Sequence, residues 1–561
     1  MLTLSGGGSL VSGGLTLDNA SSKLVLNSIT VDNVSTTSDS LGLDVDADST
    51  VTSLSVAKIT PVAIASGSSL SGGITITAGS LKLTETGTLA SSISMSGGTL
   101  DADNSLTVSG ALTHTGNITI DVAETKTLTY TGTAISLGAN TLTLTGGGSL
   151  VSGGLTLNDP SSMLLLNSIT VDSVSTSADS SSGGLDVDND STVSSLSVAH
   201  ITPVSIASGK TLSGAITVTA GSIKLDDTGT LASSISMSGG TLDADNSSTV
   251  SGALSHTADI TIDVAETKTL TYTGTAISLG THTLTLSGGG TFVSGGLDLD
   301  NANSKLLLSS ITVDNVSTSV DNSLGLDVDD DSTITSLSVA HTTPVSIASG
   351  KTLSGAITVT AGSIKLAETG TLASSISMSG GTLDADNSLT VSGTLTQSGA
   401  ITIDVADNKT LTYSGGNLNV GSHTLSIGGA GTFSNATGSP LVLDVADSIL
   451  NLTNNGTISG PVKLESGTLK STGSPTVSGA LTQYGDSTIE IAETKTLTYE
   501  GGAIEIGASA LSIIGGGNFA NNGSALELNN AASQLIFSRI TVDYIRATAD
   551  SLGIVVDNTS T

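Results

Sequence analysis

Three groups of alternating aspartates are the strongest chemical signal in the sequence. Each group has the pattern Asp-x-Asp-x-Asp, so a carboxylate recurs at every second residue. On an extended strand such carboxylates would share one face about 7 Å apart, and a hard cation such as Ca²⁺ would relieve their repulsion. The candidate Ca²⁺ ligands are Asp44, Asp46, Asp48, Asp186, Asp188, Asp190, Asp327, Asp329 and Asp331.

A solvated acidic surface is the alternative interpretation of these aspartates, and it is the one we prefer. The EF-hand pattern is not met, because the glycine at its sixth position and the distal glutamate are missing. In the last repeat the aligned residues are Val555, Asp557 and Thr559, so two of the three carboxylates are lost. We therefore predict that no cofactor is required, and that Ca²⁺ stabilises the chain at most slightly.

No other group of side chains has the composition of an active site. Polysaccharide lyases and hydrolases built on β-helices need paired acids, or a basic residue beside a carboxylate, and aromatic platforms for sugar rings. The only arginines are Arg539 and Arg546, and aromatic residues make up 2% of the chain. Each repeat also offers the same polar surface again. We therefore predict that the protein is not an enzyme.

Histidines and tyrosines recur at fixed places in the sequence. His114 and His256 exchange with Gln397 and Gln483 at aligned positions, which predicts solvent-facing side chains without a metal or catalytic role. The tyrosines close the phrase Lys-Thr-Leu-Thr-Tyr, and we expect their rings to pack at a core wall with the hydroxyl near water. They are Tyr130, Tyr272, Tyr413 and Tyr499.

The overall composition excludes several functional classes. The chain has 49 acidic and 16 basic residues, and the resulting net charge of -33 opposes binding to nucleic acid and to anionic lipid. No apolar run approaches the roughly 18 residues of a membrane span. Cysteine is absent, which excludes disulfides. The hydrophobic residues reach 37% and are almost all aliphatic, so the chain is predicted to be folded and β-rich rather than disordered.

A long repeat of about 140 residues organises the chain. The segment that begins with Leu4-Ser5-Gly6-Gly7-Gly8 returns from Leu144 and again from Leu286, and weaker copies follow. The fifth copy stops partway, so we expect the chain to be a piece of a longer protein. The predicted repeats are 2–141, 142–283, 284–424, a shortened unit 425–511 and a partial unit 512–561.

Within each repeat, a triplet of the form apolar-x-apolar recurs about every 10 to 14 residues. Leu15/Leu17 and Leu43/Val45 are examples, and this period of two predicts short strands with one buried face. Hairpin signals are scarce, and the fourth repeat shortens without damage to its neighbours, which favours a solenoid over a sandwich or propeller. The predicted fold is all-β: one right-handed parallel β-helix (β-solenoid) over 1–561, with roughly 20 residues per coil.

One recurring phrase resembles a known class of proteins. The segment Gly97-Gly98-Thr99-Leu100-Asp101-Ala102-Asp103-Asn104-Ser105-Leu106-Thr107-Val108-Ser109-Gly110 returns from Gly239 and from Gly380. It resembles the repeats of bacterial β-helical surface proteins, such as autotransporter passengers and filamentous-haemagglutinin-like adhesins. The resemblance implies a right-handed β-helix, secretion to the extracellular space or cell surface, and a role in adhesion or in extending a binding tip.

These observations predict a structural rod or stalk segment of a large extracellular bacterial fibre or adhesin. The expected partners are other copies of the chain, through end-to-end or lateral association, or flanking repeats of the same protein. The alternative is an adhesive surface along the rod that binds glycans or another cell surface. Thr75/Thr77 and the aligned Thr-x-Thr pairs raise a further alternative, ice binding, which we disfavour because the pair recurs only at the long period.

Overall fold

The computed structural model describes residues 1–557 and 560–561. Regular structure in these residues consists of β-strands, and they form no helix that could cross a membrane. Strands make up 55% of the chain and pair in parallel at a spacing of about 20 residues, which gives a β-solenoid of about 28 turns. The predicted all-β solenoid and its coil length are therefore confirmed.

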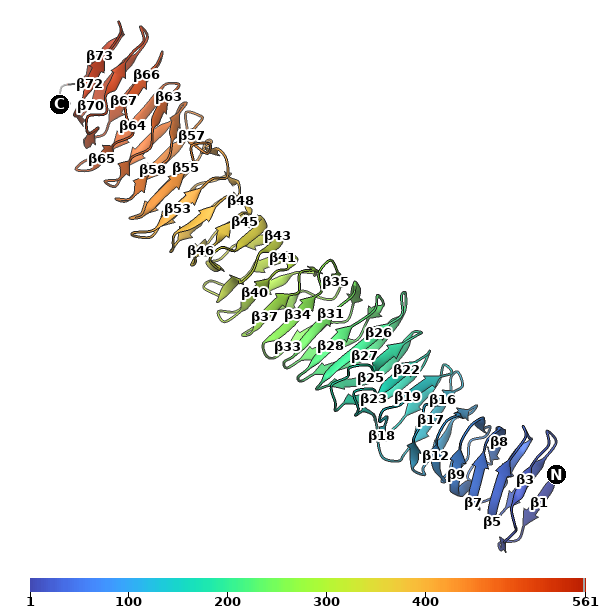
Figure 1. Ribbon diagram of the computed structural model, residues 1–561. Helices are drawn as coiled ribbons and strands as arrows, with labels where there is room; N and C mark the ends of the chain where they lie inside the picture. The colour runs from blue at the N-terminus through green and yellow to red at the C-terminus, as the bar shows by residue number, and fades with distance from the viewer. Residues whose placement is uncertain (558–559) are drawn as a thin grey trace. The chain divides into compact units, whose positions relative to one another are not determined.

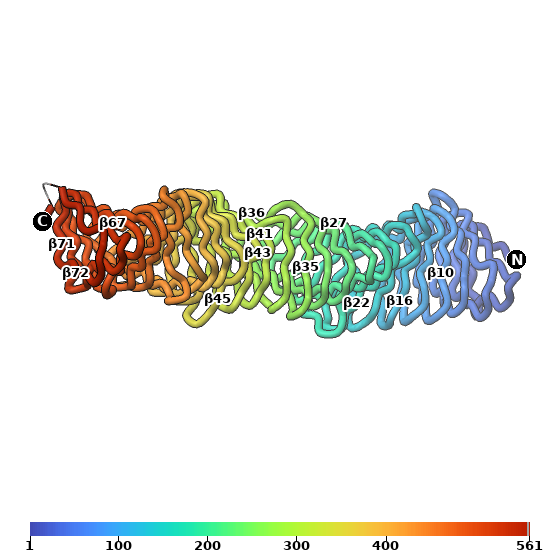
Figure 2. The backbone as a smooth tube through the Cα atoms, turned by 90° about the horizontal axis from the view of Figure 1, so that it is seen from above, coloured from blue at the N-terminus to red at the C-terminus, as the bar shows by residue number. Residues whose placement is uncertain are grey.

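Two compact units divide the chain, Met1–Thr275 and Ala276–Thr561. Within each unit the strands stack coil upon coil, as Figure 1 shows. In the tube of Figure 2, the backbone of the first unit, coloured blue to green, follows a similar path in one coil after another. The continuity of a single solenoid over 1–561 stays a prediction.

Each coil contributes to three ladders of parallel strands. In the second repeat the first ladder consists of β19 (Thr141–Thr145), β22 (Met163–Leu166), β24 (Gly184–Val187), β26 (Ile201–Ile206), β28 (Ser222–Leu225), β31 (Thr241–Ala244) and β34 (Ile260–Val264). The second and third ladders, which merge where a strand is long, consist of β20 (Ser149–Val151), β21 (Leu155–Leu157), β23 (Thr170–Thr176), β25 (Ser191–Val198), β27 (Thr211–Val218), β29 (Thr230–Leu231), β30 (Ser234–Met237), β32 (Ser248–Val250), β33 (Leu254–His256), β35 (Thr269–Tyr272) and β36 (Ile277–Ser278).

The other repeats follow the same order with one exception. The first repeat runs from β1 (Leu2–Ser5) to β18 (Ile135–Ser136), and the third runs from β37 (Thr283–Ser287) to β54 (Leu418–Asn419). The fourth repeat holds only the strands from β55 (Thr424–Gly429) to β66 (Ile504–Ile506). The predicted loss of strands from the fourth repeat is therefore confirmed.

The core of each coil is aliphatic because alternate strand residues point inward. Leu164 lies in register between Leu142 and Leu185 of the neighbouring coils, and none of the three side chains is more than 2% exposed. Burying such a side chain contributes about 1.5–3 kcal/mol. Because the same positions recur in each coil, the core is a set of stacked ladders rather than one central cluster.

A bulge with a glycine opposite it recurs at the same place in three repeats. The register between β25 and β27 shifts between Val193 and Leu196, and Gly214 of β27 lies there with a φ of 125°. A Cβ atom at Gly214 would lie 1.8 Å from the carbonyl oxygen of Val193. The equivalent glycines, Gly72 and Gly355, would bring a Cβ to 1.9 Å and 1.8 Å from the preceding coil. Only glycine fits this crossing of two backbones.

The four recurring tyrosines lie inside the coils, and the expectation of a hydroxyl near water is wrong. Their exposure ranges from 0% at Tyr499 to 4% at Tyr130. The hydroxyl of Tyr130 accepts a hydrogen bond from the backbone N–H of Leu112 at 3.1 Å, in the preceding coil. Tyr272 and Tyr413 accept the same bond from Leu254 and Leu395. The tyrosine therefore satisfies a buried backbone group where the second and third ladders separate.

Candidate functional site

The structure separates the three aspartates of each predicted triad. β24 ends at Val187, so Asp186 lies on the strand while Asp188 and Asp190 lie in the turn that follows. The strands β6 (Gly42–Val45) and β42 (Gly325–Val328) end at the equivalent residues of their repeats. The expected face of three carboxylates on one strand is therefore not formed, because the strand stops after the first.

In the first and third repeats, the first aspartate of the triad forms an ion pair with a lysine of the preceding coil. Asp44 forms an ion pair with Lys23 at 2.5 Å, and Asp327 forms one with Lys305 at 2.7 Å. In the second repeat Met163 stands at the position of these lysines. The pKa of Asp186 is raised, first by burial and then by the negative charges of Asp188 and Asp227.

The third aspartate of each triad accepts a backbone hydrogen bond from the first residue of a strand in the following coil. The donors are Ser69, Thr211 and Thr352, and the distances from their nitrogens to the carboxylates of Asp48, Asp190 and Asp331 are 2.8, 2.9 and 2.8 Å. In the described part of the chain, no three His, Cys, Asp or Glu side chains are grouped so as to hold a metal ion. The interpretation of these aspartates as a solvated acidic surface that Ca²⁺ stabilises at most slightly stays a prediction, and Thr559 lies outside the described residues.

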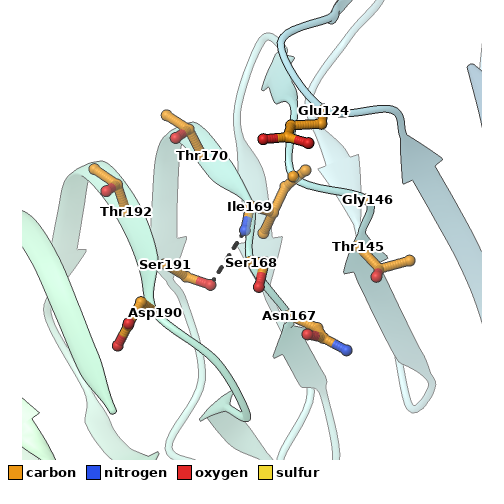
Figure 3. A pocket seen from close by; sticks show the side chains of 11 residues that line it. Glu124, Thr145, Gly146, Asn167, Ser168, Ile169, Thr170, Asp190, Ser191 and Thr192 are labelled. Atoms are coloured by element: carbon orange, nitrogen blue, oxygen red, sulfur yellow. Dashed lines mark hydrogen bonds between the residues drawn. The ribbon is translucent and has the colours of Figure 1, made fainter. Parts of the chain in front are cut away.

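An open cleft of about 610 Å³ lies at the start of the second repeat, and Asp190 is one of its lining residues. In Figure 3, Glu124 and Asp190 lie on opposite sides of Ser168 and Ile169. Thr170 and Thr192 are neighbours in register on β23 and β25. The full lining is Glu124, Thr145, Gly146, Gly147, Asn167, Ser168, Ile169, Thr170, Asp190, Ser191 and Thr192.

Glycines form one wall of this cleft because a side chain would collide with the preceding coil. A Cβ atom on Gly146 would lie 2.1 Å from Oδ1 of Asp121 and 2.3 Å from the carbonyl oxygen of Val122. Gly147 has a φ of 83°, in the left-handed region that favours glycine. The wall is therefore bare backbone, which a ligand can approach closely.

The floor of the cleft carries a strained residue. Ser168 has a φ of 54°, a left-handed conformation that is uncommon for residues other than glycine, asparagine and aspartate. It positions the next residue, Ile169, whose N–H donates a hydrogen bond to Oγ of Ser191 at 3.3 Å. This is the dashed line in Figure 3. Strain of this kind is held in place by its surroundings and often marks a functional surface.

A smaller cleft of about 240 Å³ occupies the same place in the first repeat. Ser28 corresponds to Ser168 and has nearly the same φ, 55°. In the last repeat Arg539 stands at this position with a φ of 50°. The residues that line both clefts at aligned positions are Gly7, Ser28, Ile29, Thr30, Asp48, Ser49 and Thr50 in the first repeat.

The cleft is suited to hydrogen bonding rather than to covalent chemistry. Its charged lining residues are the exposed carboxylates of Glu124 and Asp190, and its other polar side chains are hydroxyls and the amide of Asn167. No lining residue supplies a base next to a nucleophile. In the sequence, the glycine run only marks the start of each repeat. The run is followed in the first two repeats by the aligned residues Asp48 and Asp190, and this joint recurrence is the signal that could have indicated the cleft.

The positions shared by histidine and glutamine hold neighbouring coils together, so the expectation that they face solvent is wrong. The half-buried ring of His114 places Nε2 3.1 Å from the carbonyl oxygen of Ser136, in the next coil. Nε2 of Gln483 donates to the carbonyl oxygen of Ala510 at 2.9 Å, also in the next coil. Histidine and glutamine exchange here because both bring a nitrogen to a backbone carbonyl.

Serine side chains flank the Thr-x-Thr pairs on adjacent coils of the third ladder. Thr75 of β9 (Ser69–Ile76) lies in register between Ser55 and Ser94, and Thr217 lies between Ser197 and Ser236. The Thr-x-Thr pair itself is absent from these adjacent coils, as expected from its long period, and ice binding stays disfavoured. The row alternates serine with threonine and does not repeat the Thr-x-Thr pair, so outward-facing strand residues remain the sufficient explanation.

The first ladder stacks carboxylates that the sequence reasoning did not single out. Asp243 of β31 lies in register between Lys224 and Asp263. Burial, followed by the charge of Asp245, raises the pKa of Asp243 to about 6. Lys224 lowers this pKa, but its hydrogen bond goes to Asp245 instead. At neutral pH the Asp243 carboxylate is therefore ionised although its burial and the nearby charge of Asp245 disfavour the ionised form.

We expect Asp243→Asn to raise the melting temperature at pH 7. The folded pKa of about 6 lies above the ordinary value of 3.8, so the folded state binds more protons between these two values. Stability contributed by the protonated carboxyl is therefore lost as pH rises through about 6, and the variant should remove this dependence. Thermal unfolding at pH 4 and pH 7 measures it, with Asp18→Asn, at an exposed residue, as the control. A variant no more stable than the parent at pH 7 would contradict the assignment.

Comparison with known proteins identifies no relative of this chain. No family model matches the sequence, no curated protein matches it, and no solved structure matches the fold.

Proposed function

We propose that this chain is a structural rod or stalk segment of a large extracellular bacterial fibre or adhesin. The observation that carries the proposal is the continuous strand pairing through the shortened fourth repeat. Its first-ladder strands β55, β58 (Ile449–Leu452), β61 (Thr468–Ser471) and β64 (Ser487–Ile491) pair in register without interruption although whole coils are missing. Length can thus change without changing the fold, which is the property that a spacer requires.

Composition and phrase resemblance support the extracellular part of the proposal. The charge of -33 opposes nucleic acid and anionic membranes as partners. The recurring Gly-Gly-Thr-Leu-Asp phrase resembles the repeats of bacterial surface proteins, and the described solenoid agrees with that resemblance at the level of the fold. The proposed partners are flanking repeats of the same protein or further copies of the chain. Catalysis is not part of the proposed role.

Deletion of one repeat tests the spacer role directly. Removing residues 142–283 joins Thr141 to Leu284, which restores the Thr-Leu step of the parent and keeps the coil register. Seven coils at a rise of about 4.8 Å predict a particle shorter by about 34 Å, with little change in melting temperature. Small-angle scattering and electron microscopy of the full chain and the deletion measure the length.

A second deletion serves as the control for this experiment. Removing residues 142–273 joins Thr141 to Gly274, which places a turn where the first ladder should continue. This variant should lose ordered coils at the junction. If the in-register deletion also unfolds, or if its length equals that of the parent, the chain is not a modular spacer.

An adhesive surface that binds glycans is the second candidate function. The observation that favours it is the cleft lined by Glu124, Asp190 and several hydroxyls, which a purely passive spacer does not need. A weak site that recurs along a stalk can give strong attachment through avidity.

A further inference from the structure

We propose that the cleft at the start of the second repeat, and its counterpart in the first repeat, bind an uncharged oligosaccharide. The inference rests on the second candidate function and specifies its site and ligand, and it holds whether or not the chain acts as a spacer. It rests on the lining, the recurrence and the strained floor of the two clefts.

The charge of the lining excludes anionic ligands. Glu124 and Asp190 are both exposed carboxylates, and no basic side chain lines the cleft to balance them. A sulfated or sialylated glycan, a nucleic acid or a phosphate would therefore meet repulsion that the net charge of -33 increases. The carboxylates instead accept hydrogen bonds, and a sugar offers many hydroxyl donors.

The strands around the cleft exclude a peptide bound by strand addition. β22 pairs with β19 on one side and β24 on the other, and β23 pairs with both β20 and β25. No free strand edge is left at the cleft for an extended peptide to extend the sheet. The apolar lining residue Ile169 is 2% exposed, so an apolar ligand finds little surface. A polyhydroxyl ligand remains as the chemical class that fits.

Recognition can be assigned to side chains on both sides of the strained serine. The hydroxyls of Thr170 and Thr192 stand side by side and can both donate and accept. Asn167 accepts a hydrogen bond at its Oδ1 from Asn189 at 2.7 Å, which leaves its own amide hydrogens to donate to a ligand. The glycine wall allows a sugar ring to approach the backbone. A volume of about 610 Å³ lies in the range of ligand clefts.

The recurrence of the cleft supports selection of a surface rather than an accident of packing. Seven aligned residues line both clefts, and Ser28 and Ser168 share the left-handed conformation. Two sites on one unit raise the strength of attachment to a polymer above that of either site.

A pair of arginine substitutions tests the proposal without breaking the fold. Arg539 already occupies the equivalent left-handed position in the last repeat, so the backbone there accepts an arginine. In the double variant Ser28→Arg with Ser168→Arg, the long side chains should fill both clefts. The control is Thr75→Arg with Thr217→Arg, which adds the same charge on exposed strand positions outside both clefts. Circular dichroism and melting curves establish that each variant is folded.

The full chain and its variants are then applied to immobilised oligosaccharides. The probes are neutral hexose oligomers, chitosan oligomers as cationic sugars, and heparin and sialylated glycans as anionic sugars. We expect binding to at least one neutral oligomer, a loss of at least tenfold in the Ser28/Ser168 variant, and no loss in the control. Glu124→Gln, at an exposed side chain, should weaken binding severalfold.

Several outcomes would overturn the proposal. Binding to none of the neutral oligomers would do so, as would neutral binding that the Ser28/Ser168 variant retains. Binding only to the anionic or only to the chitosan probes would show that charge, and not hydroxyl recognition, governs the surface. None of these outcomes bears on the length of the deletion variants, so the spacer role is tested separately.

Discussion

Replacing Gly214 with alanine is expected to destabilise its coil by about 4 kcal/mol. The added Cβ would lie 1.8 Å from the carbonyl oxygen of Val193 in the preceding coil, and the φ of 125° is itself unfavourable for alanine. The two backbones must move apart to remove the collision. Movement there breaks the in-register bonds between β25 and β27 on both sides of the bulge. The effect should therefore exceed that of an ordinary surface substitution by far.

Hydrogen exchange followed by mass spectrometry is the suitable measurement. A long repeat array opens locally, so the exchange of β25 and β27 amides reports the loss better than a single melting temperature. The matched control is Gly209→Ala, because Gly209 also has a positive φ, 73°, but has no atom within 4 Å of its ideal Cβ. The control should cost about 1 kcal/mol from backbone strain alone. Equal exchange in the two variants would show that the backbone of Val193 does not closely restrict the side chain at position 214.

Replacing Tyr413 with alanine is expected to lower the free energy of unfolding by about 4 kcal/mol, and replacing it with phenylalanine by about 1–2 kcal/mol. The ring of Tyr413 is 1% exposed and stacks on Phe433 with centroids 6.4 Å apart. Its hydroxyl accepts the N–H of Leu395 at 3.2 Å. Burial also raises the pKa of Tyr413, so the hydroxyl stays protonated at neutral pH. Alanine leaves a cavity, whereas phenylalanine leaves only one buried donor without a partner.

Exchange and denaturant unfolding of the third repeat separate these two contributions. Tyr484→Ala is the control, because Tyr484 is 61% exposed and its removal should have little effect. If Tyr413→Phe is as stable as the parent, then water reaches the N–H of Leu395. That result would restore the expectation of a hydroxyl near water.

Local patterns predicted the elements well because each strand is short and has one buried face. The alternation in Leu43-Asp44-Val45 appears as β6, with both apolar side chains buried and Asp44 half-buried. The glycine run at Gly146 marks a turn at the start of the repeat, as its spacing indicates. The aspartate triads were predicted less well, since the pattern continues through Asp188 and Asp190 although β24 ends at Val187. Alternation shows which residues can face the same way, but it does not show where the strand stops.

By itself the sequence determined the solenoid class, the coil length and the aliphatic core, because these depend on spacing along the chain. Only the tertiary structure decided which residues meet across coils. His114 contacts Ser136, Asp48 accepts from Ser69, and Tyr413 accepts from Leu395, at separations of 22, 21 and 18 residues. Each separation depends on the length of the intervening turns, and those lengths vary from coil to coil. The cleft was hidden for the same reason, since Glu124, Ser168 and Asp190 come from three different coils, and the whole lining spans four successive coils that meet only when the chain has wound past itself.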